Sequence, residues 1–153
     1  MSTAKSDLCS DASFGVIVRC GSSGALHQMQ GQSGKLVFGT EIICRSERGL
    51  EVGEILSEAP LFSNGASQPN FPVVQYVRTL RSEDRFLWKK LQELSQQASE
   101  ECHRFLESNG SEDILLEAEP LIDGRTVFFL FLGDFSNSTK EFVEQLSDIY
   151  QQN

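Results

Sequence analysis

An apolar stripe between residues 82 and 110 constrains the fold more than any other feature of the chain. The stripe consists of Leu87, Leu91, Leu94, Ala98, Cys102 and Phe105, which recur at steps of three and four residues. This spacing predicts one apolar face on an α-helix of about seven turns. Ser82 is a suitable N-cap, Glu83 and Asp84 complement the helix dipole, and Asn109-Gly110 ends the helix. We expect the face to pack in the protein's own core; a seam for a partner is the alternative.

The stretch Ile42–Leu56 predicts two short strands joined by a tight turn. Apolar residues precede Arg48-Gly49, and apolar residues alternate with Glu51 after it, which is the period of a strand with one buried face. Gly49 supplies the backbone freedom that a tight turn needs, and Gly53 indicates a bulge or a close approach of two backbones. We therefore expect both glycines to have a structural role.

Short apolar and β-branched runs predict the other strands. These runs cover residues 14–20, 35–38, 73–77, 114–118 and 126–132. The stretch 21–34 is rich in Gly, Ser and Gln, and we expect a loop or a wide connection there. The run Val127–Leu132 is apolar on both faces, which predicts a central strand covered on each side. Ser138 and Glu141 form a capping box that predicts a last helix ending near Tyr150.

Together these elements predict an α+β protein with two lobes. The expected division is a disordered tail at 1–13, a β lobe at 14–57, a linker at 58–72 and a second lobe at 73–153. The linker is placed where the composition shifts to Ser, Asn, Gly, Gln and Pro. We expect the first lobe to be a small β-sheet or partial barrel. The second lobe reads β-α-β-β-α, which is most of a ferredoxin-like unit.

Charge, hydropathy and cysteine spacing narrow the range of possible functions and locations. The 13 basic and 22 acidic residues give a net charge of -9, which disfavours general nucleic-acid binding because phosphate neutralisation dominates that affinity. No apolar run approaches the ~20 residues of a membrane span, and the polar N-terminal residues do not resemble a signal peptide. Cys9, Cys20, Cys44 and Cys102 are widely spaced. We expect a cytoplasmic protein with reduced thiols, no membrane contact and no metal site.

No constellation of residues indicates catalysis. His27 and His103 lack the nearby Asp or Ser of a catalytic triad, and Gly21–Gly24 is not followed by the Lys-Ser or Lys-Thr of a phosphate loop. The carboxylates lie on alternating strand faces and at helix ends, where solvation explains them. We therefore expect a protein that is not an enzyme, with no cofactor and no small-molecule substrate.

Basic residues gather at two places, the hairpin and the start of the long helix. Two interpretations of these residues stay open: a surface for an acidic protein partner or for RNA phosphates, or salt bridges with carboxylates nearby on the helix. On the first interpretation, the predicted partner-binding residues are Arg45, Arg48, Glu51 and Glu54 on the hairpin and Arg78, Arg81 and Arg85 at the helix start.

Three short motifs are similar to those of a known family. They are Arg48, Gly49, Glu51 and Gly53; Arg81, Ser82 and Asp84; and Asp134-Phe135. With the order of elements over residues 14 to 151, they resemble the polymerase-suppressor-protein C-terminal domain family (YaaT-like). The chain departs from the family pattern in three ways. The helix-start Thr is replaced, Ser136 stands where the family has a basic residue, and the last strand and cysteine-rich segment of longer members are absent.

The resemblance implies a non-enzymatic adaptor in complexes that regulate RNA turnover or development. Some eukaryotic relatives bind RNA, so direct RNA binding through the basic residues is the alternative to binding partner proteins. The family's iron–sulfur cluster is not expected in this chain alone; at most Cys44 would join a cluster shared between subunits. The absent last strand would leave an open sheet edge that a partner could pair.

Overall fold

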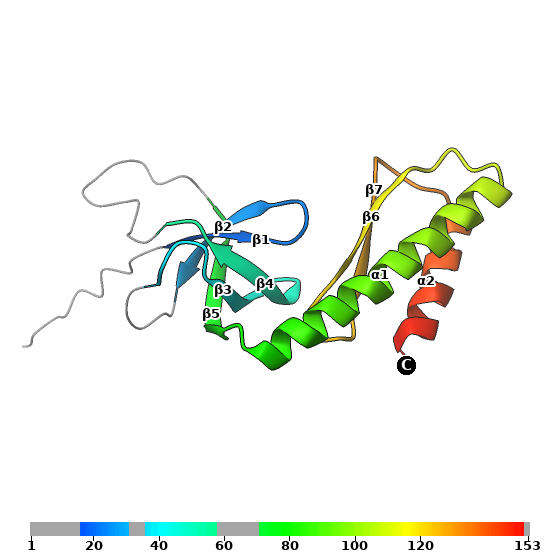
Figure 1. Ribbon diagram of the computed structural model, residues 1–153. Helices are drawn as coiled ribbons and strands as arrows, with labels where there is room; N and C mark the ends of the chain where they lie inside the picture. The colour runs from blue at the N-terminus through cyan, green and yellow to red at the C-terminus, as the bar shows by residue number, and fades with distance from the viewer. Residues whose placement is uncertain (1–15, 31–35, 58–70, 152–153) are drawn as a thin grey trace, which may run out of the picture.

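The first five strands close into a barrel (Figure 1). The computed structural model describes residues 16–30, 36–57 and 71–151. The barrel strands are β1 (Val16–Cys20), β2 (Ala25–Gln30), β3 (Glu41–Ser46), β4 (Gly49–Ile55) and β5 (Val73–Thr79). Their order around the barrel is β1-β2-β5-β3-β4, and β4 pairs with β1 to close it. All neighbours are antiparallel except β2 and β5, which are parallel.

Apolar side chains from every strand fill the barrel. Val18, Met29, Ile42, Ile55 and Val74 are fully buried in one cluster. A strand sends alternate side chains to opposite faces, so each strand contributes every second residue to this interior. Burial of one such side chain contributes about 1.5–3 kcal/mol relative to its exposure. The barrel therefore has a hydrophobic core of its own.

The barrel differs from the sequence-based expectation at two strands. β2 lies within residues 21–34, where we expected a loop, because Met29 packs in the interior although its neighbours in sequence are polar. β5, which we expected in the second lobe, pairs with β2 and β3 instead. The ferredoxin-like lobe is therefore not confirmed, since its first strand belongs to the barrel. Leu36–Phe38, expected as part of a strand, is not one.

The second lobe packs two helices against one face of a β-hairpin. Its elements are α1 (Ser82–Ser108), β6 (Leu115–Pro120), β7 (Val127–Phe131) and α2 (Asn137–Gln151). In Figure 1, α1 extends from the barrel to the far end of the molecule. The buried residues of the lobe's core are Ala98, Cys102, Leu106, Leu115 and Leu146. The expected long helix and the α+β class are thus confirmed. Ala98, Cys102 and Phe105 of the apolar stripe pack in this core, whereas Leu87 is exposed.

Two local expectations for this lobe are wrong. The run Val127–Leu132 is not a central strand, because within the described residues β7 pairs only with β6. Helix α2 is capped by Ser136 rather than Ser138: Lys140 N donates to the Ser136 carbonyl at 3.0 Å, and Thr139 N donates to Ser136 Oγ at 3.4 Å. The first helix shows a smaller shift, with Arg81 at its N-cap.

A third hydrophobic cluster joins the lobes. Ile43, on the outer side of the barrel, is buried with Leu80 and with Ile122 of the β6–β7 turn, and Trp88 of α1 packs against them. The backbone also crosses the junction, because Ile122 N donates to the Leu50 carbonyl at 3.2 Å. The barrel and the second lobe therefore share a packed interface.

The predicted tail at 1–13 and nearly all of the predicted linker at 58–72 lie outside the described residues. In the part that the structure does describe, neither helix has the length and apolar character needed to cross a membrane.

Candidate functional site

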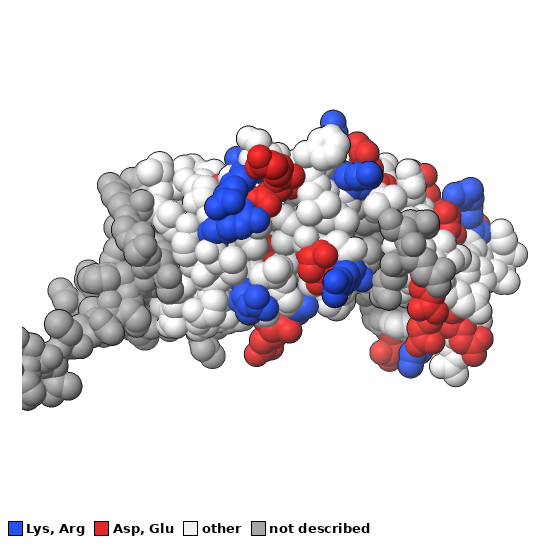
Figure 2. Space-filling view, turned by 90° about the horizontal axis from the view of Figure 1, so that it is seen from below, with Lys and Arg blue, Asp and Glu red and all other residues white. Residues whose placement is uncertain are grey.

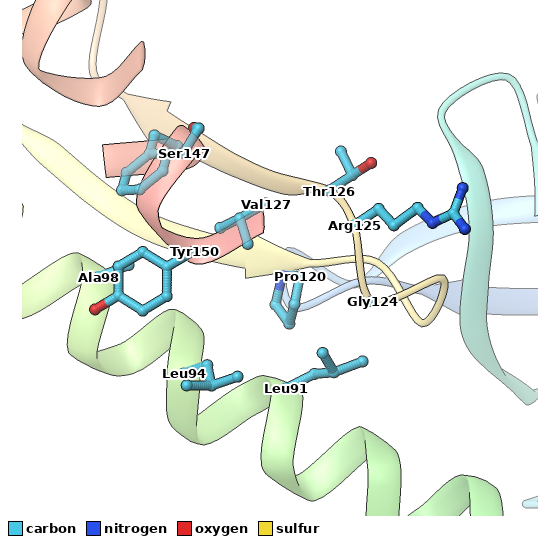
Figure 3. Close-up of a pocket in the computed structure, with 11 residues that line it drawn as sticks. Leu91, Leu94, Ala98, Pro120, Gly124, Arg125, Thr126, Val127, Ser147 and Tyr150 are labelled. Carbon is cyan, nitrogen blue, oxygen red and sulfur yellow. The ribbon is translucent and has the colours of Figure 1, made fainter. Parts of the chain in front are cut away.

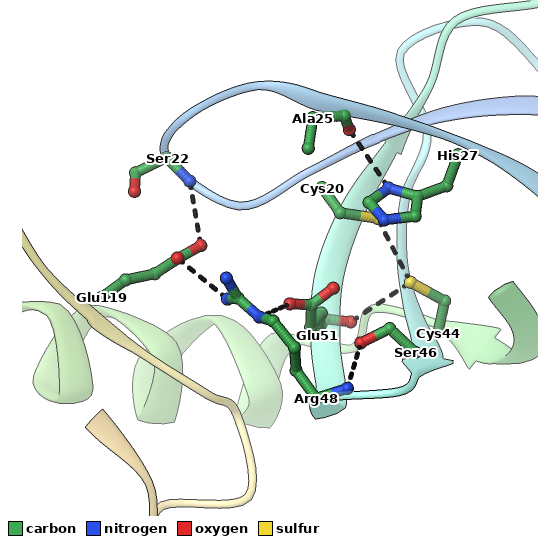
Figure 4. A network of polar contacts seen from close by, with 9 residues as sticks. All are labelled: Cys20, Ser22, Ala25, His27, Cys44, Ser46, Arg48, Glu51 and Glu119. Atoms are coloured by element: carbon green, nitrogen blue, oxygen red, sulfur yellow. Dashed lines mark hydrogen bonds and ion pairs between the residues drawn. The ribbon is translucent and has the colours of Figure 1, made fainter. Parts of the chain in front are cut away.

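The centre of the predicted hairpin site is an ion-pair network around Arg48 (Figure 4). Arg48 lies in the β3–β4 turn, where its Nε is 2.8 Å from Glu51 Oε1 and its Nη2 is 2.8 Å from Glu119 Oε2. The side chains of Glu51 and Glu119 are only 6% and 4% exposed. The guanidinium carbon also lies 4.6 Å from the centre of the Phe128 ring, a favourable cation–π distance. Arg48 therefore neutralises two buried carboxylates, one from each lobe.

Glu119 also fixes the β1–β2 turn of the barrel. Its Oε1 accepts a hydrogen bond of 3.2 Å from the backbone N–H of Ser22. The adjacent Gly21 has φ +70°, and a Cβ on Gly21 would overlap Glu119 Oε1. Sequence reasoning missed Glu119 as a site residue. The signal available in the sequence was an acidic residue next to Pro120 at the end of an apolar strand. This signal is weak.

The charges in the network determine the protonation of Arg48. Desolvation lowers the pKa of Arg48, but its hydrogen bond to Glu119 and the charges of Glu51 and Glu119 outweigh that effect and raise the pKa. The guanidinium thus stays charged and paired. We conclude that Arg48 and Glu51, two of the predicted partner-binding residues, are committed to contacts inside the molecule.

The basic residues at the start of α1 are also largely paired. Arg78 holds Asp84 through two hydrogen bonds, one of them Nη2 to Oδ1 at 2.7 Å. The hydrogen bond from Arg78, followed by one of 2.8 Å from Arg81 N, lowers the pKa of Asp84 to about 2. Arg85 forms an ion pair with Glu41 of β3. The salt-bridge interpretation, which named carboxylates on the helix, therefore describes Arg78, whereas Arg85 is paired with a carboxylate of the barrel.

Of the other predicted site residues, only Arg45 and Arg81 remain exposed cations. Neither guanidinium forms an ion pair within residues 16–30, 36–57 and 71–151. Glu54 pairs with Arg19 across β1 and β4. Figure 2 shows the consequence over one face, where basic and acidic side chains lie beside one another instead of forming a patch of one sign.

The two glycines of the hairpin have different roles. Gly49 has φ +136°, a conformation that disfavours L side chains, and it opens β4 after the turn. Gly53 instead lies where β1 approaches closely, because a Cβ on it would lie 2.5 Å from Val18 Cγ1. The regular β3–β4 register through Gly53 contains no bulge, so close packing accounts for this glycine.

Two buried thiols lie behind the network. Cys20 Sγ and Cys44 Sγ are 3.5 Å apart inside the barrel, and both residues are buried. The hydrogen bond to Cys44 and then burial raise the pKa of Cys20 far above its usual range, so this thiol stays protonated and unreactive. A cluster shared between subunits would need Cys44 at the surface, whereas Cys44 is fully buried. No group of three or more metal-ligating side chains gathers in the described part of the chain.

The cavities of the molecule differ in size and lining. A small apolar cavity of about 40 Å³ lies between α1, α2 and the β6–β7 hairpin (Figure 3). Arg125, at its edge, points away from it toward the barrel. Two wider grooves of about 310 and 440 Å³ flank Glu119 at the lobe junction. The first cavity is well below the usual few hundred Å³ of a metabolite site, whereas the two grooves reach the lower end of that range. The paired side chain of Glu119 lines both grooves.

The outer face of the β6–β7 hairpin carries exposed apolar side chains at the end away from the barrel, with Glu117 and Glu119 nearer the barrel. Phe129 and Phe131 of β7 face the helices, so the opposite face of the hairpin carries their sequence neighbours. On that side Ile114 is 51%, Leu116 59% and Leu132 62% exposed. Such grouped exposed apolar residues are typical of interaction surfaces. We call Ile114, Leu116 and Leu132 the outer hairpin patch.

Comparison of the chain with models of protein families, with curated proteins and with solved structures returns no match. The resemblance that the three motifs indicate therefore stays a prediction.

Proposed function

We propose that this protein is a non-enzymatic cytoplasmic adaptor that binds partner proteins in RNA turnover or developmental regulation, as the resemblance to the polymerase-suppressor C-terminal (YaaT-like) family implies. The observation that carries the proposal is the outer hairpin patch of Ile114, Leu116 and Leu132, each more than half exposed. Removal of apolar surface from water is favourable by about 25 cal/mol per Å². A protein partner that covers the patch would gain this free energy.

The ion pairs of the predicted site support a protein partner over RNA. RNA affinity depends on cations that are available to phosphates. Arg48, Arg78 and Arg85 are instead held by carboxylates of this chain. Arg45 and Arg81 remain exposed, and they are suited to a polar rim around an apolar contact. The carboxylates of the junction are likewise held in ion pairs, an arrangement that suits rigidity better than proton transfer.

Capture of partners from the protein's own cells tests this proposal. The full-length tagged chain would be compared with Leu116→Lys, which places a charge in the outer hairpin patch. Leu26→Lys on β2 is the matched control, because Leu26 is a 39% exposed leucine on the barrel. We expect proteins that survive nuclease treatment to be captured by the wild type and Leu26→Lys and lost with Leu116→Lys.

Two results would contradict the adaptor proposal. Equal capture by Leu116→Lys and wild type would exclude the outer hairpin patch as the contact. Loss of all partners with nuclease, together with recovered RNA and a steep salt dependence of binding, would favour direct RNA binding. In that case Arg45→Glu and Arg81→Glu should weaken RNA binding, because these are the exposed cations of the predicted site.

A further inference from the structure

The hairpin segment of the second lobe is charged almost entirely with one sign. Residues 105–139, from the last turn of α1 to the first turn of α2, contain seven acidic side chains and one basic side chain, Arg125. Arg125 lies in the β6–β7 turn, which contacts the barrel, and it points toward the barrel (Figure 3). The outer hairpin patch lies at the opposite end of the hairpin. The segment itself therefore supplies no cation beside the patch.

Three of these carboxylates are unpaired and stand around the outer hairpin patch. Asp113 is held by the first turn of α2 and Glu119 by the ion-pair network. The carboxylates of Glu112, Glu117 and Asp134 form no ion pair and no hydrogen bond within the described residues. We call Glu112, Glu117 and Asp134 the acidic rim.

The hairpin register places the acidic rim next to the patch. Glu117 lies on the outer face, because it pairs with Leu130 whereas the neighbouring Phe129 faces the helices. In the chain it directly follows the patch residue of β6. Glu112 precedes the first patch residue by two positions, and Asp134 follows the last one by two. The patch therefore combines exposed apolar side chains with uncompensated negative charge.

No cation of the barrel neutralises Glu117 within the described residues. Arg19 lines the same groove of about 310 Å³ as Glu117, but its guanidinium pairs with Glu54. A partner that covers the patch must therefore bring its own positive charges, since like charges at a contact are unfavourable and opposite charges select the partner.

We propose that the outer hairpin patch binds a basic amphipathic helix of a partner protein. The apolar stripe of that helix lies on the patch, and its lysine or arginine side chains lie beside the acidic rim. An apolar centre with a charged border is the usual composition of such contacts. This inference rests on the proposed adaptor function and specifies the chemistry of its partner.

The geometry of the patch suits a helix better than a strand. An added strand pairs through its backbone at the edge of a sheet, whereas the patch consists of side chains on a face. A helix about 10 Å in diameter spans two strands that lie about 5 Å apart. α1 and α2 pack on the opposite face of the same hairpin, so a bound helix would complete a helix–sheet–helix sandwich.

Binding of two model peptides to the full chain tests this inference. The probe is a fluorescently labelled peptide of leucine and lysine, about four helical turns long, with its leucines on one face. The matched peptide has glutamate in place of every lysine. Fluorescence anisotropy measures both dissociation constants. We expect the leucine–lysine peptide to bind at least about tenfold more tightly, with an affinity that falls as salt is added.

Two pairs of variants locate the binding site of the leucine–lysine peptide. Leu116→Lys should weaken binding more than about tenfold. Leu26→Lys, which changes the net charge equally at an exposed leucine of the barrel, should leave it nearly unchanged. Glu117→Lys should weaken binding about tenfold, whereas Glu144→Lys, at an exposed position of α2, should not. Circular dichroism verifies that each variant folds.

Equal affinities for the two peptides would overturn the inference, because the contact would then be apolar alone. Equal effects of Glu117→Lys and Glu144→Lys would overturn it too, because binding would then follow net charge. Both outcomes leave the adaptor proposal standing if Leu116→Lys still loses the proteins captured from cells. Unchanged capture by Leu116→Lys would instead remove the adaptor proposal, and this inference with it.

Discussion

Arg48 Nη2 and Glu119 Oε2 lie 2.8 Å apart and join the β3–β4 turn of the barrel to strand β6 of the second lobe. The Glu119 side chain is almost fully buried, whereas the Arg48 side chain is 36% exposed. This asymmetry determines the effect of mutation, because removal of the arginine leaves a buried charge without its partner. Arg48 is thus a residue of the lobe junction, and a substitution there does not report on partner binding alone.

Arg48→Met should lower the free energy of unfolding by about 2–3 kcal/mol, at or below the lower end for a broken buried ion pair because the arginine is partly exposed. Urea unfolding of the purified protein measures this effect. Arg45→Met is the control, since Arg45 is exposed on the same hairpin without an ion pair in the described chain, and it should change stability by less than about 0.5 kcal/mol. Equal decreases in the free energy of unfolding for Arg48→Met and Arg45→Met would show that the ion-pair network does not stabilise the fold.

Gly21→Ala should be more destabilising than Gly24→Ala, although both glycines lie in the β1–β2 turn with φ +70°. Each alanine pays for the left-handed backbone, about 1–2 kcal/mol. Only Gly21→Ala also collides with Glu119, whereas a Cβ on Gly24 would lie 3.6 Å from Arg19 Cδ. The collision should cost about 1–3 kcal/mol more. Thermal or urea unfolding would test this, and Glu119→Ala should reduce the difference between the two variants.

Protonation of Asp113 should make the protein less stable in acid. Hydrogen bonds to its carboxylate, first from Thr139 Oγ1 at 2.6 Å and then from Ser136, lower its pKa to about 2. Because the folded pKa is lowered, the stabilisation is present above the ordinary Asp value of about 4 and is lost as the pH falls toward 2. Asp113→Asn should flatten the dependence of the urea midpoint on pH between 4 and 2.

The neighbouring Glu112 provides the control for the acid effect. It is exposed and forms no hydrogen bond or ion pair in the part of the chain that the structure describes. Glu112→Gln should therefore leave the acid dependence of the urea midpoint unchanged. A flattening by Glu112→Gln as large as that by Asp113→Asn would assign the effect to net charge rather than to the cap of α2.

The three described thiols should resist modification in the folded protein. Cys20, Cys44 and Cys102 are buried, and burial raises the pKa of Cys102 as the hydrogen bond to Cys44 raises that of Cys20. In a Cys9→Ser background, a disulfide reagent at pH 8 should react slowly in buffer and rapidly in denaturing urea. Rapid reaction of the folded protein would contradict the burial of these thiols.

The same thiols predict a loss of stability in alkali. A thiol whose folded pKa is raised holds its proton more tightly than in the unfolded chain. Its contribution is complete below the ordinary cysteine value of about 8.5 and declines as the pH rises above that value. The urea midpoint should therefore fall above about pH 9, and the fall should be smaller in Cys20→Ser than in the parent protein.

The sequence by itself determined the local elements whose periodicity depends on near neighbours. The stripe that contains Ala98 and Cys102 defined helix α1, and the alternation around Arg48-Gly49 defined the β3–β4 hairpin. Such patterns are legible because one turn of helix or two residues of strand decide which side is buried. The three motifs also indicated the hairpin as a site, but they did not show which of its charges face solvent.

Only the tertiary structure decided which strands pair and which charges are neutralised. β5 left the predicted second lobe because Val74 fills the barrel between β2 and β3. Ser22 and Glu119 are hydrogen-bonded although 97 residues separate them, and Arg48 depends on the same carboxylate. Contacts between residues so far apart in the chain leave no periodic signal in the sequence, because they depend on how the two lobes pack against each other. The role of Arg48 was therefore decided by packing between the lobes.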